Sequence, residues 1–326
     1  MRFLLDETGL KLGELSAREV RDVLETFAEV VERVHQDDEA PVQMLRAARD
    51  EVVWRELSLL DLLTSRDLSS TELTLLRDVR IRLLRALEKM PAWDDEVTPD
   101  ALDVQLDGEE LSAMTLAWAC SLKQGGEAVG CLVLTTAGRA GERELRCQGR
   151  TARLHFIATL SDYLDFLRAS LLVEAQDVHR FMERAPRAFP SLVWRDGVKA
   201  ELRTHKSSFF DERLEVLIRH LGVLNDFGAR IFHTATDPRD RVSQLMPLGV
   251  NASSESGRAK ASKKATQDHT RPWNGQHLQF WWHTKITPGD GGRIHFLHVP
   301  PSTTMPDDEH PHGRIVIGIF THHLTV

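Results

Sequence analysis

Three segments close together in the sequence decide the fold of the chain: QHLQFWWHTKI at residues 276–286, RIHFLHV at 293–299 and GRIVIGIFTHHL at 313–324. Within each segment apolar and polar side chains alternate over a short run, which is typical of a β-strand with one buried face. A turn rich in Gly, Pro and Asp separates the first two segments, and a long polar loop separates the second from the third. Together the segments predict a twisted antiparallel sheet.

The predicted sheet has one cationic, imidazole-rich face. Because alternate residues of a strand point to the same side, His283 shares a face with Lys285, and Arg293 shares a face with His295. Apolar residues take the opposite face of these two strands: Phe280, Trp282, Ile286, Ile294 and Phe296. In the third strand His322 lies on one side, and three isoleucines lie on the other: Ile315, Ile317 and Ile319. A face of this kind predicts a site for an anionic ligand.

The composition is that of a soluble globular protein. The 326 residues are 41% hydrophobic and 28% charged, and no run approaches the roughly 18 apolar residues of a membrane span. The N-terminal stretch MRFLLDETG lacks the apolar region of a secretory signal. Three cysteines, an odd number without metal-binding spacing, argue against a disulfide framework. These features predict a cytoplasmic protein with no membrane contact and no cofactor.

Positive charge is concentrated in one part of an otherwise acidic chain. The formal net charge is −8, which argues against a protein coated for nucleic acid. Between residues 251 and 293, however, there are seven Lys and Arg and three Asp and Glu, so this segment carries +4. Its first part, 251–271, is too poor in apolar residues to form a core and predicts a solvated loop or one that orders on a ligand. Five cations of this loop are the predicted nucleic-acid-binding residues: Arg258, Lys260, Lys263, Lys264 and Arg271.

The N-terminal part of the chain predicts helices. Ser16 with Glu19, and Ser69 with Glu72, have the spacing of capping boxes, in which both side chains bond the backbone at the start of a helix. Apolar residues follow each box at helical intervals. A further helix is predicted over residues 42–63.

Three regions follow from these patterns: a helical region at 1–92, an α/β region with an antiparallel sheet and helices at 93–190, and a small C-terminal α+β domain at 191–326. In the middle region, the segments on both sides of Lys-Gln-Gly-Gly at 123–126 predict a β-hairpin. In the C-terminal region a helix over 209–232 precedes the sheet. The predicted fold class is therefore α+β.

The cationic face supplies the groups that metal-independent RNA cleavage needs. Attack by a ribose 2′-hydroxyl requires a base for that hydroxyl, an acid for the leaving oxygen and cations that stabilise the phosphorane. Five residues form the predicted catalytic set: His283, Lys285, Arg293, His295 and His322. Which histidine transfers protons is left open, because a shift of one residue in strand register exchanges the faces. Alternatively, the cations serve solubility at a domain edge and the histidines pack in the core.

A metal site is another alternative. One His-rich and acidic segment contains the residues concerned: Asp307, Asp308, Glu309, His310, His312, His322 and His323. Neutral imidazoles and carboxylates are good ligands for zinc or manganese. The sequence contains no HExxH motif, and residues 300–311 are typical of a surface loop, so no metal ligand is assigned. The Gly-, Ser- and Lys-rich loop at 256–264 could bind phosphates but lacks the P-loop motif.

The segments WHTKI, RIHFLHV and RIVIGIFTHHL, preceded by a helix, resemble the RelE/HigB-like bacterial toxins over roughly residues 205–326. Members of that family are ribosome-dependent mRNA interferases with a small α+β fold, and their sites use Lys, Arg, His and Tyr on a sheet face without a metal; the one tyrosine of this chain, Tyr163, lies outside the similar region. The resemblance implies that Lys285 and Arg293 bind and activate the phosphate. It also implies that His322 or His295 transfers protons.

Two functions are therefore predicted. The first is a cytoplasmic toxin-like or anti-phage effector that cleaves RNA, with RNA or the ribosome as its partner. The acidic N-terminal region would restrain or target this effector through a protein contact. The second is a non-enzymatic binding or assembly module for nucleic acid or an acidic protein. Substituting Lys285 or Arg293 by alanine separates the two, because cleavage would be abolished in the first and affinity only modestly reduced in the second.

Overall fold

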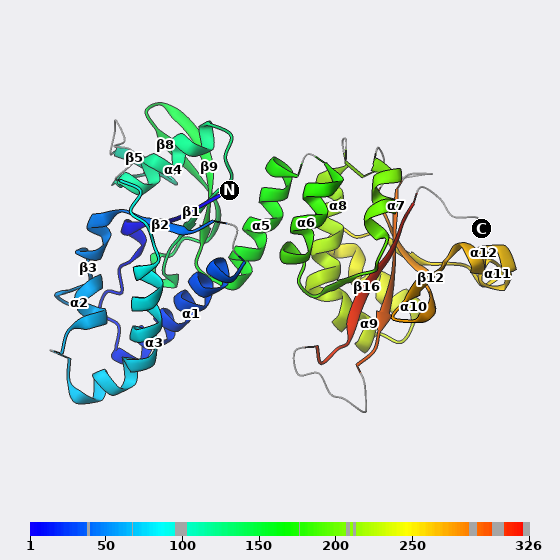
Figure 1. Ribbon diagram of the computed structural model, residues 1–326, viewed down its shortest axis with the longest axis horizontal. Coiled ribbons are helices and arrows are strands. Elements are labelled where there is room, and N and C mark those ends of the chain that lie inside the picture. Colours follow the sequence, from blue (N-terminus) through cyan, green and yellow to red (C-terminus); the bar gives the residue numbers. More distant parts are fainter. Residues whose placement is uncertain are drawn as a thin grey trace. The chain divides into compact units, whose positions relative to one another are not determined.

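Two units make up the protein, Met1–Val173 and Glu174–Val326, and both are drawn as ribbons in Figure 1. This computed structural model describes residues 1–37, 40–66, 68–94, 103–175, 177–206, 209–210, 213–286, 292–301 and 310–321. Each unit combines helices with a mixed sheet, so the predicted α+β class is confirmed. No helix among these residues is long and apolar enough to cross a membrane.

A seven-stranded sheet forms the centre of the first unit, in the order β2-β1-β7-β9-β8-β5-β6. The neighbours from β2 to β9 are parallel, and the remaining neighbours are antiparallel. The strands are β1 Arg2–Leu5, β2 Val42–Met44, β5 Asp103–Leu106, β6 Glu109–Ser112, β7 Val129–Leu132, β8 Gly141–Cys147 and β9 Arg150–Ile157. Because β1 lies between β2 and β7, the predicted regions 1–92 and 93–190 share one sheet. The boundary lies between residues 173 and 174 rather than near 92 and 190.

The longer helices of the first unit begin where the sequence predicts. Ser16 and Glu19 form a capping box at the start of α1, and Ser69 and Glu72 form another at the start of α3. The inward face of α1 is the apolar stripe expected of an amphipathic helix. The helices of this unit are α1 Ala17–Gln36, α2 Leu59–Thr64, α3 Ser70–Glu88, α4 Met114–Gln124 and α5 Leu160–Glu174.

Two predictions in this unit are wrong. The predicted helix at 42–63 is instead strand β2, a short hairpin of β3 Val52–Trp54 and β4 Leu57–Ser58, and the start of α2. The predicted hairpin at 123–126 is the end of α4. There Gly126, at φ 87°, donates to the Lys123 carbonyl, and the next residue donates to the Leu122 carbonyl, which are the paired bonds of a Schellman motif. Two glycines suit both a hairpin and a helix end, and the upstream Met, Leu and Ala favour the helix.

The second unit contains a five-stranded sheet in the order β10-β16-β15-β14-β11. Strand β10 is parallel to β16, and the other neighbours are antiparallel. The strands are β10 Leu192–Trp194, β11 Ala252–Ser254, β14 Trp282–Lys285, β15 Arg293–Val299 and β16 Arg314–Thr321. Residues 282–285, 293–299 and 314–321 thus form adjacent antiparallel strands, as predicted, whereas residues 276–279, predicted to belong to the first of these strands, form β13 instead. A separate hairpin joins β12 Thr270–Trp273 to β13 Gln276–Gln279.

Seven α-helices precede or separate the strands of this sheet along the described chain. They are α6 Val178–Ala188, α7 Val198–Thr204, α8 Leu214–Val223, α9 Ala229–Thr234, α10 Pro238–Leu245, α11 Gly257–Ala261 and α12 Lys263–Asp268. A π-helical turn, Leu224–Gly228, joins α8 to α9, so the helix predicted over 209–232 is largely confirmed. The segment 251–271, predicted to be a loop, is not one. It folds into β11, α11 and α12, because Ser256 and Ser262 cap the two helices and small buried alanines anchor them.

The two faces of the C-terminal sheet differ only in part as the alternation predicts, because Phe280 packs with Val316 and Ile319 on the side of His295 and not with Trp282. On the apolar face the Phe232 ring of α9 packs edge-on against Trp282 and Phe296, with centroid distances of 4.8 and 5.3 Å. One prediction about β16 is wrong. Ile317 pairs with Phe296, but Ile319 pairs with His295, so the two isoleucines lie on opposite faces. The intervening glycine is the extra residue of a β-bulge, which reverses the alternation.

Candidate metal centre

Four side chains from separate elements converge beside the C-terminal sheet: Glu255, His269, His283 and His295. Glu255 directly follows β11, where its backbone N–H donates to the Trp281 carbonyl at 3.0 Å. His269 is the residue at the end of α12. His283 and His295 lie directly opposite each other on β14 and β15. Sheet pairing and the α11–α12 segment therefore bring one carboxylate and three imidazoles together.

One nitrogen of each of two imidazoles is occupied by a backbone carbonyl. His269 Nδ1 lies 2.8 Å from the Ala265 oxygen, and His295 Nδ1 lies 3.2 Å from the Phe280 oxygen. A carbonyl oxygen can only accept, so in a neutral ring the proton is on Nδ1 and the Nε2 atom has a lone pair. Neither Nε2 has a hydrogen-bond partner within the described part of the chain. In the neutral form both Nε2 atoms have a lone pair that can bind a metal, and His269 Nε2 faces Glu255 Oε1 at 3.5 Å.

These two imidazoles and the carboxylate of Glu255 form a compact donor set. Their ligand atoms all lie within 4.8 Å of one another, and Glu255 Oε1 is 3.5 Å from His269 Nε2. Two ligands of a tetrahedral zinc ion, each about 2.0–2.1 Å from the metal, are separated by about 3.3 Å. The observed spacing thus needs only a small adjustment to hold one ion between Glu255, His269 and His295.

The third imidazole, that of His283, contacts the Glu255 carboxylate of this donor set. His283 Nδ1 lies 3.1 Å from Glu255 Oε1, and its Nε2 lies 3.0 Å from the Ser253 hydroxyl. Metal-binding carboxylates are commonly held by a further polar residue of this kind, which fixes their orientation. On the other side, the Trp281 ring stacks on His269 with a centroid distance of 4.7 Å.

Burial favours the neutral form of His283 and His295, and contact with histidines favours the anionic form of Glu255. His269, His283 and His295 are 1%, 3% and 0% exposed. Burial holds the pKa of His295 well below its usual range, and burial also lowers the pKa of His283 although Glu255 raises it. Contact with His269, and then with His283, lowers the pKa of Glu255 well below its usual range. At neutral pH His295 is therefore uncharged and Glu255 is an anion.

The predicted catalytic residues divide into three groups. His283 and His295 are neighbours on one face, and Lys285 is paired directly with Arg293 further along the same two strands, so the predicted sharing of a face is confirmed. Lys285 and Arg293 are half-buried, whereas the two histidines are buried. His322 lies outside the described residues. The catalytic roles of all five residues stay predictions.

The predicted nucleic-acid-binding residues also divide. Arg258, Lys260, Lys263 and Lys264 are exposed on α11 and α12. Arg271 is half-buried and forms an ion pair with Glu201 at 2.9 Å, whereas the other four form no ion pair with a described residue. In the alternative His-rich metal segment, His310 and His312 are described, and the remaining candidates are outside the described residues.

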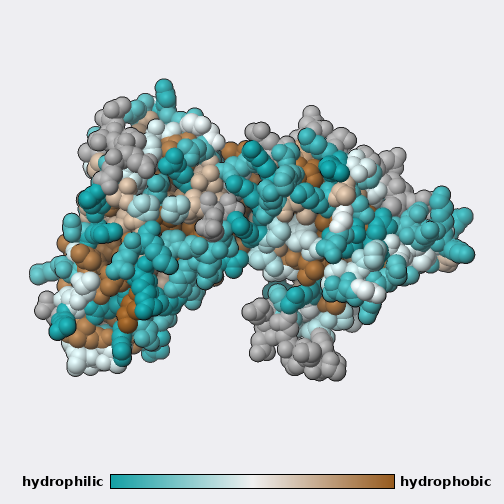
Figure 2. All heavy atoms as spheres, in the orientation of Figure 1, coloured by the Kyte–Doolittle hydropathy of each residue, from teal (hydrophilic) through white to brown (hydrophobic). Residues whose placement is uncertain are grey.

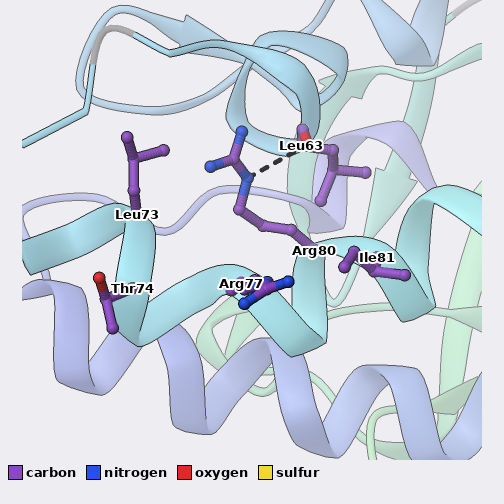
Figure 3. A pocket seen from close by; sticks show the side chains of 6 residues that line it. All are labelled: Leu63, Leu73, Thr74, Arg77, Arg80 and Ile81. Carbon is purple, nitrogen blue, oxygen red and sulfur yellow. Dashed lines mark hydrogen bonds between the residues drawn. The ribbon is translucent and has the colours of Figure 1, made fainter. Parts of the chain in front are cut away.

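A surface hollow of about 370 Å³ on the first unit lies between α2 and α3 (Figure 3). It is lined by Leu63, Leu73, Thr74, Arg77, Arg80 and Ile81. The Arg80 guanidinium does not point into it freely, because Nε donates to the Leu63 carbonyl at 3.1 Å and Nη2 donates to the Ser65 carbonyl at 2.6 Å. Arg80 therefore satisfies the carbonyls at the end of α2, which is a structural role.

A second buried charged group lies at the end of β1. Asp6 is fully buried and lies 3.3 Å from Arg139 Nη1, and its other oxygen accepts from the backbone and hydroxyl of Thr8. Burial raises the pKa of Asp6, although Arg139 lowers it. Both carboxylate oxygens of Asp6 are in contact with Arg139 or Thr8, and the carboxylate is buried. Asp6 therefore contributes to the fold of the first unit and is hardly accessible to a ligand.

Comparison of the chain with protein-family models, with curated proteins and with solved structures found no match. Glu255 and His269 are the candidate functional residues that the sequence does not reveal. Both lie in a segment whose composition predicts a solvated loop, and only its folding onto the sheet brings them to His283 and His295.

Proposed function

We propose that the second unit, Glu174–Val326, binds a divalent transition metal, with Zn²⁺ as the best-suited ion, through Glu255, His269 and His295. The observation that carries the proposal is the meeting of three lone-pair donors, two of them imidazole nitrogens whose other ring nitrogen is held by a backbone carbonyl. Without a cation or a proton between them, such donors repel one another in a buried site. Imidazole and carboxylate ligands suit Zn²⁺.

The proposed metal has a structural role. All three ligand side chains are less than a tenth exposed, which leaves a large substrate no direct approach to the ion. His295 belongs to the central part of the sheet, whereas Glu255 and His269 stand at the two ends of the α11–α12 segment. A shared ion would fasten that segment to the sheet. Metal binding of this kind contributes directly to folding free energy.

The test is the metal content and affinity of the full-length protein. The protein is stripped with a chelator, reloaded with Zn²⁺ and analysed for bound metal, and competition with a chromogenic chelator gives the dissociation constant. We expect one zinc ion per chain. His269→Ala should remove it, and His283→Ala should weaken binding about 10–100-fold because it removes a supporting residue rather than a ligand.

His277→Ala is the matched control, because His277 is an exposed histidine on β13 outside the cluster. It should bind zinc as tightly as the wild type. A wild-type protein that takes up no metal, or equal losses in the His277 and His269 variants, would overturn the proposal. The RNA-cleaving function expected from the sequence remains a separate prediction.

A further inference from the structure

Two short helices of the second unit carry a concentrated positive charge. We call residues 256–268, which contain α11 and α12, the cationic arm. Its exposed cations are Arg258, Lys260, Lys263 and Lys264. The stretch 256–267 contains no Asp or Glu. In Figure 1 the arm (gold) lies at one end of the second unit, and Figure 2 shows hydrophilic side chains over the same part of the view.

None of these four cations forms an ion pair within the described parts of the chain. Lys260 donates to the Ser254 hydroxyl at 2.8 Å, which is a neutral partner. Arg258, Lys263 and Lys264 form no ion pair with any described residue. Four like charges on two adjacent short helices repel one another, and a polyanion that binds them would relieve that repulsion.

The arm is held at both ends by residues of the candidate metal centre. Glu255 immediately precedes α11, and His269 immediately follows α12. Between them, Ala259 and Ala265 are buried, at 1% and 0% exposed, and these small side chains are the apolar anchors of the two helices. Because alanines bury little area, the contacts of Glu255 and His269 at the two ends contribute to holding the arm in place.

We propose that the cationic arm binds the phosphate backbone of a nucleic acid, and that the metal ion held by Glu255, His269 and His295 fixes the arm in its binding orientation. The proposal rests on the proposed metal-binding function. In the absence of metal the two helices lose their common anchor. Their cations then no longer form one fixed surface, and affinity for a regularly charged backbone falls.

The composition of the arm favours phosphates over an acidic protein. Protein interfaces depend on buried aromatic and large apolar side chains. The sequence of the arm, SGRAKASKKATQD, contains none of these and offers only Ala beside its polar residues. Recognition by charge alone suits nucleic acid, whose backbone presents one negative charge per roughly 1.7 Å of duplex axis and whose binding is dominated by counterion release.

The test measures binding of the zinc-loaded full-length protein to a fluorescently labelled DNA duplex, and to the matching RNA duplex, by anisotropy at several salt concentrations. For DNA, Lys263→Ala should reduce the slope of log affinity against log salt by about 0.9, and Lys263→Ala with Lys264→Ala by about 1.8. Arg239→Ala is the control, because Arg239 is an exposed cation of α10 outside the arm. It should leave the slope unchanged.

Metal dependence is tested with chelator-stripped protein and with His269→Ala. Both should bind the duplex at least as weakly as the double lysine variant. Zinc binding without duplex or RNA binding would overturn this inference and leave the metal-binding function intact. Equal binding by zinc-loaded and stripped protein would overturn the role of the metal. Equally tight binding to polyglutamate would overturn the assignment to phosphates. Failure to bind zinc would remove the proposed function and this inference together.

Discussion

Removing the metal should lower the stability of the second unit by a predictable amount. A ligand that binds only the folded state stabilises it by about 2.7 kcal/mol when its free concentration is 100 times its dissociation constant. For a domain of 150–250 residues, which includes the unit Glu174–Val326, each kcal/mol shifts Tm by roughly 2–4 °C. Zinc at that concentration should therefore raise the Tm of this unit by about 5–11 °C relative to the protein in chelator.

Scanning calorimetry of the full-length protein measures this shift, and hydrogen exchange assigns it to a region. Amides of β11, β14 and β15 should gain protection with zinc, whereas amides of the first unit, Met1–Val173, should not. His295→Leu is the informative variant. The Tm of each protein is measured with and without zinc, so any change that the substitution makes to the metal-free stability does not affect the comparison of the two shifts. No zinc-dependent shift in the wild type, or the same shift in His295→Leu, would refute the reasoning.

Three further predictions concern the same unit. Because the folded pKa of His295 is depressed, the metal-free unit should lose stability as the pH falls below the unfolded value near 6.5; an unchanged urea midpoint between pH 7.5 and 5.5 would contradict this. Gly318→Ala should destabilise by about 1–3 kcal/mol in urea unfolding, since its Cβ would lie 2.1 Å from the Phe280 ring, whereas Gly257→Ala, with open space around it, should be tolerated. Trp281→Phe should abolish most of the zinc-dependent change in tryptophan fluorescence, because Trp281 stacks on a candidate ligand.

Local patterns in the sequence predicted the part of the site that lies on neighbouring strands. Alternation placed His283 with Lys285 and Arg293 with His295, and the observed pairing joins these residues across β14 and β15. Period-2 alternation is a property of the strand itself, so it needs no knowledge of the rest of the fold. It fails at Gly318, the extra residue of the bulge, where the Phe280 ring occupies the space that a side chain would need.

The other half of the site depends on contacts that no local pattern contains. Glu255 and His269 belong to a polar segment with few apolar residues, and such a composition predicts solvation. The segment orders because small alanines pack, serine side chains cap two short helices, and β11 pairs with β14. For the same reason the helical pattern of residues 1–92 does not indicate that β1 shares a sheet with strands of the next region, since the pairing of β1 with β7 joins residues far apart in the chain.

The burial of the imidazoles also bears on the choice between metal-free RNA chemistry and metal binding. A general acid or base must reach the proton that it transfers, and its pKa works best near the operating pH. His295 is fully buried, and burial drives its pKa well below its usual range, so both requirements work against a proton-transfer role for this residue. The same two properties favour a ligand, because metal binding needs a neutral imidazole and gains from the exclusion of water. Lys285 and Arg293, which are only half-buried, remain open to an anionic ligand beside the centre.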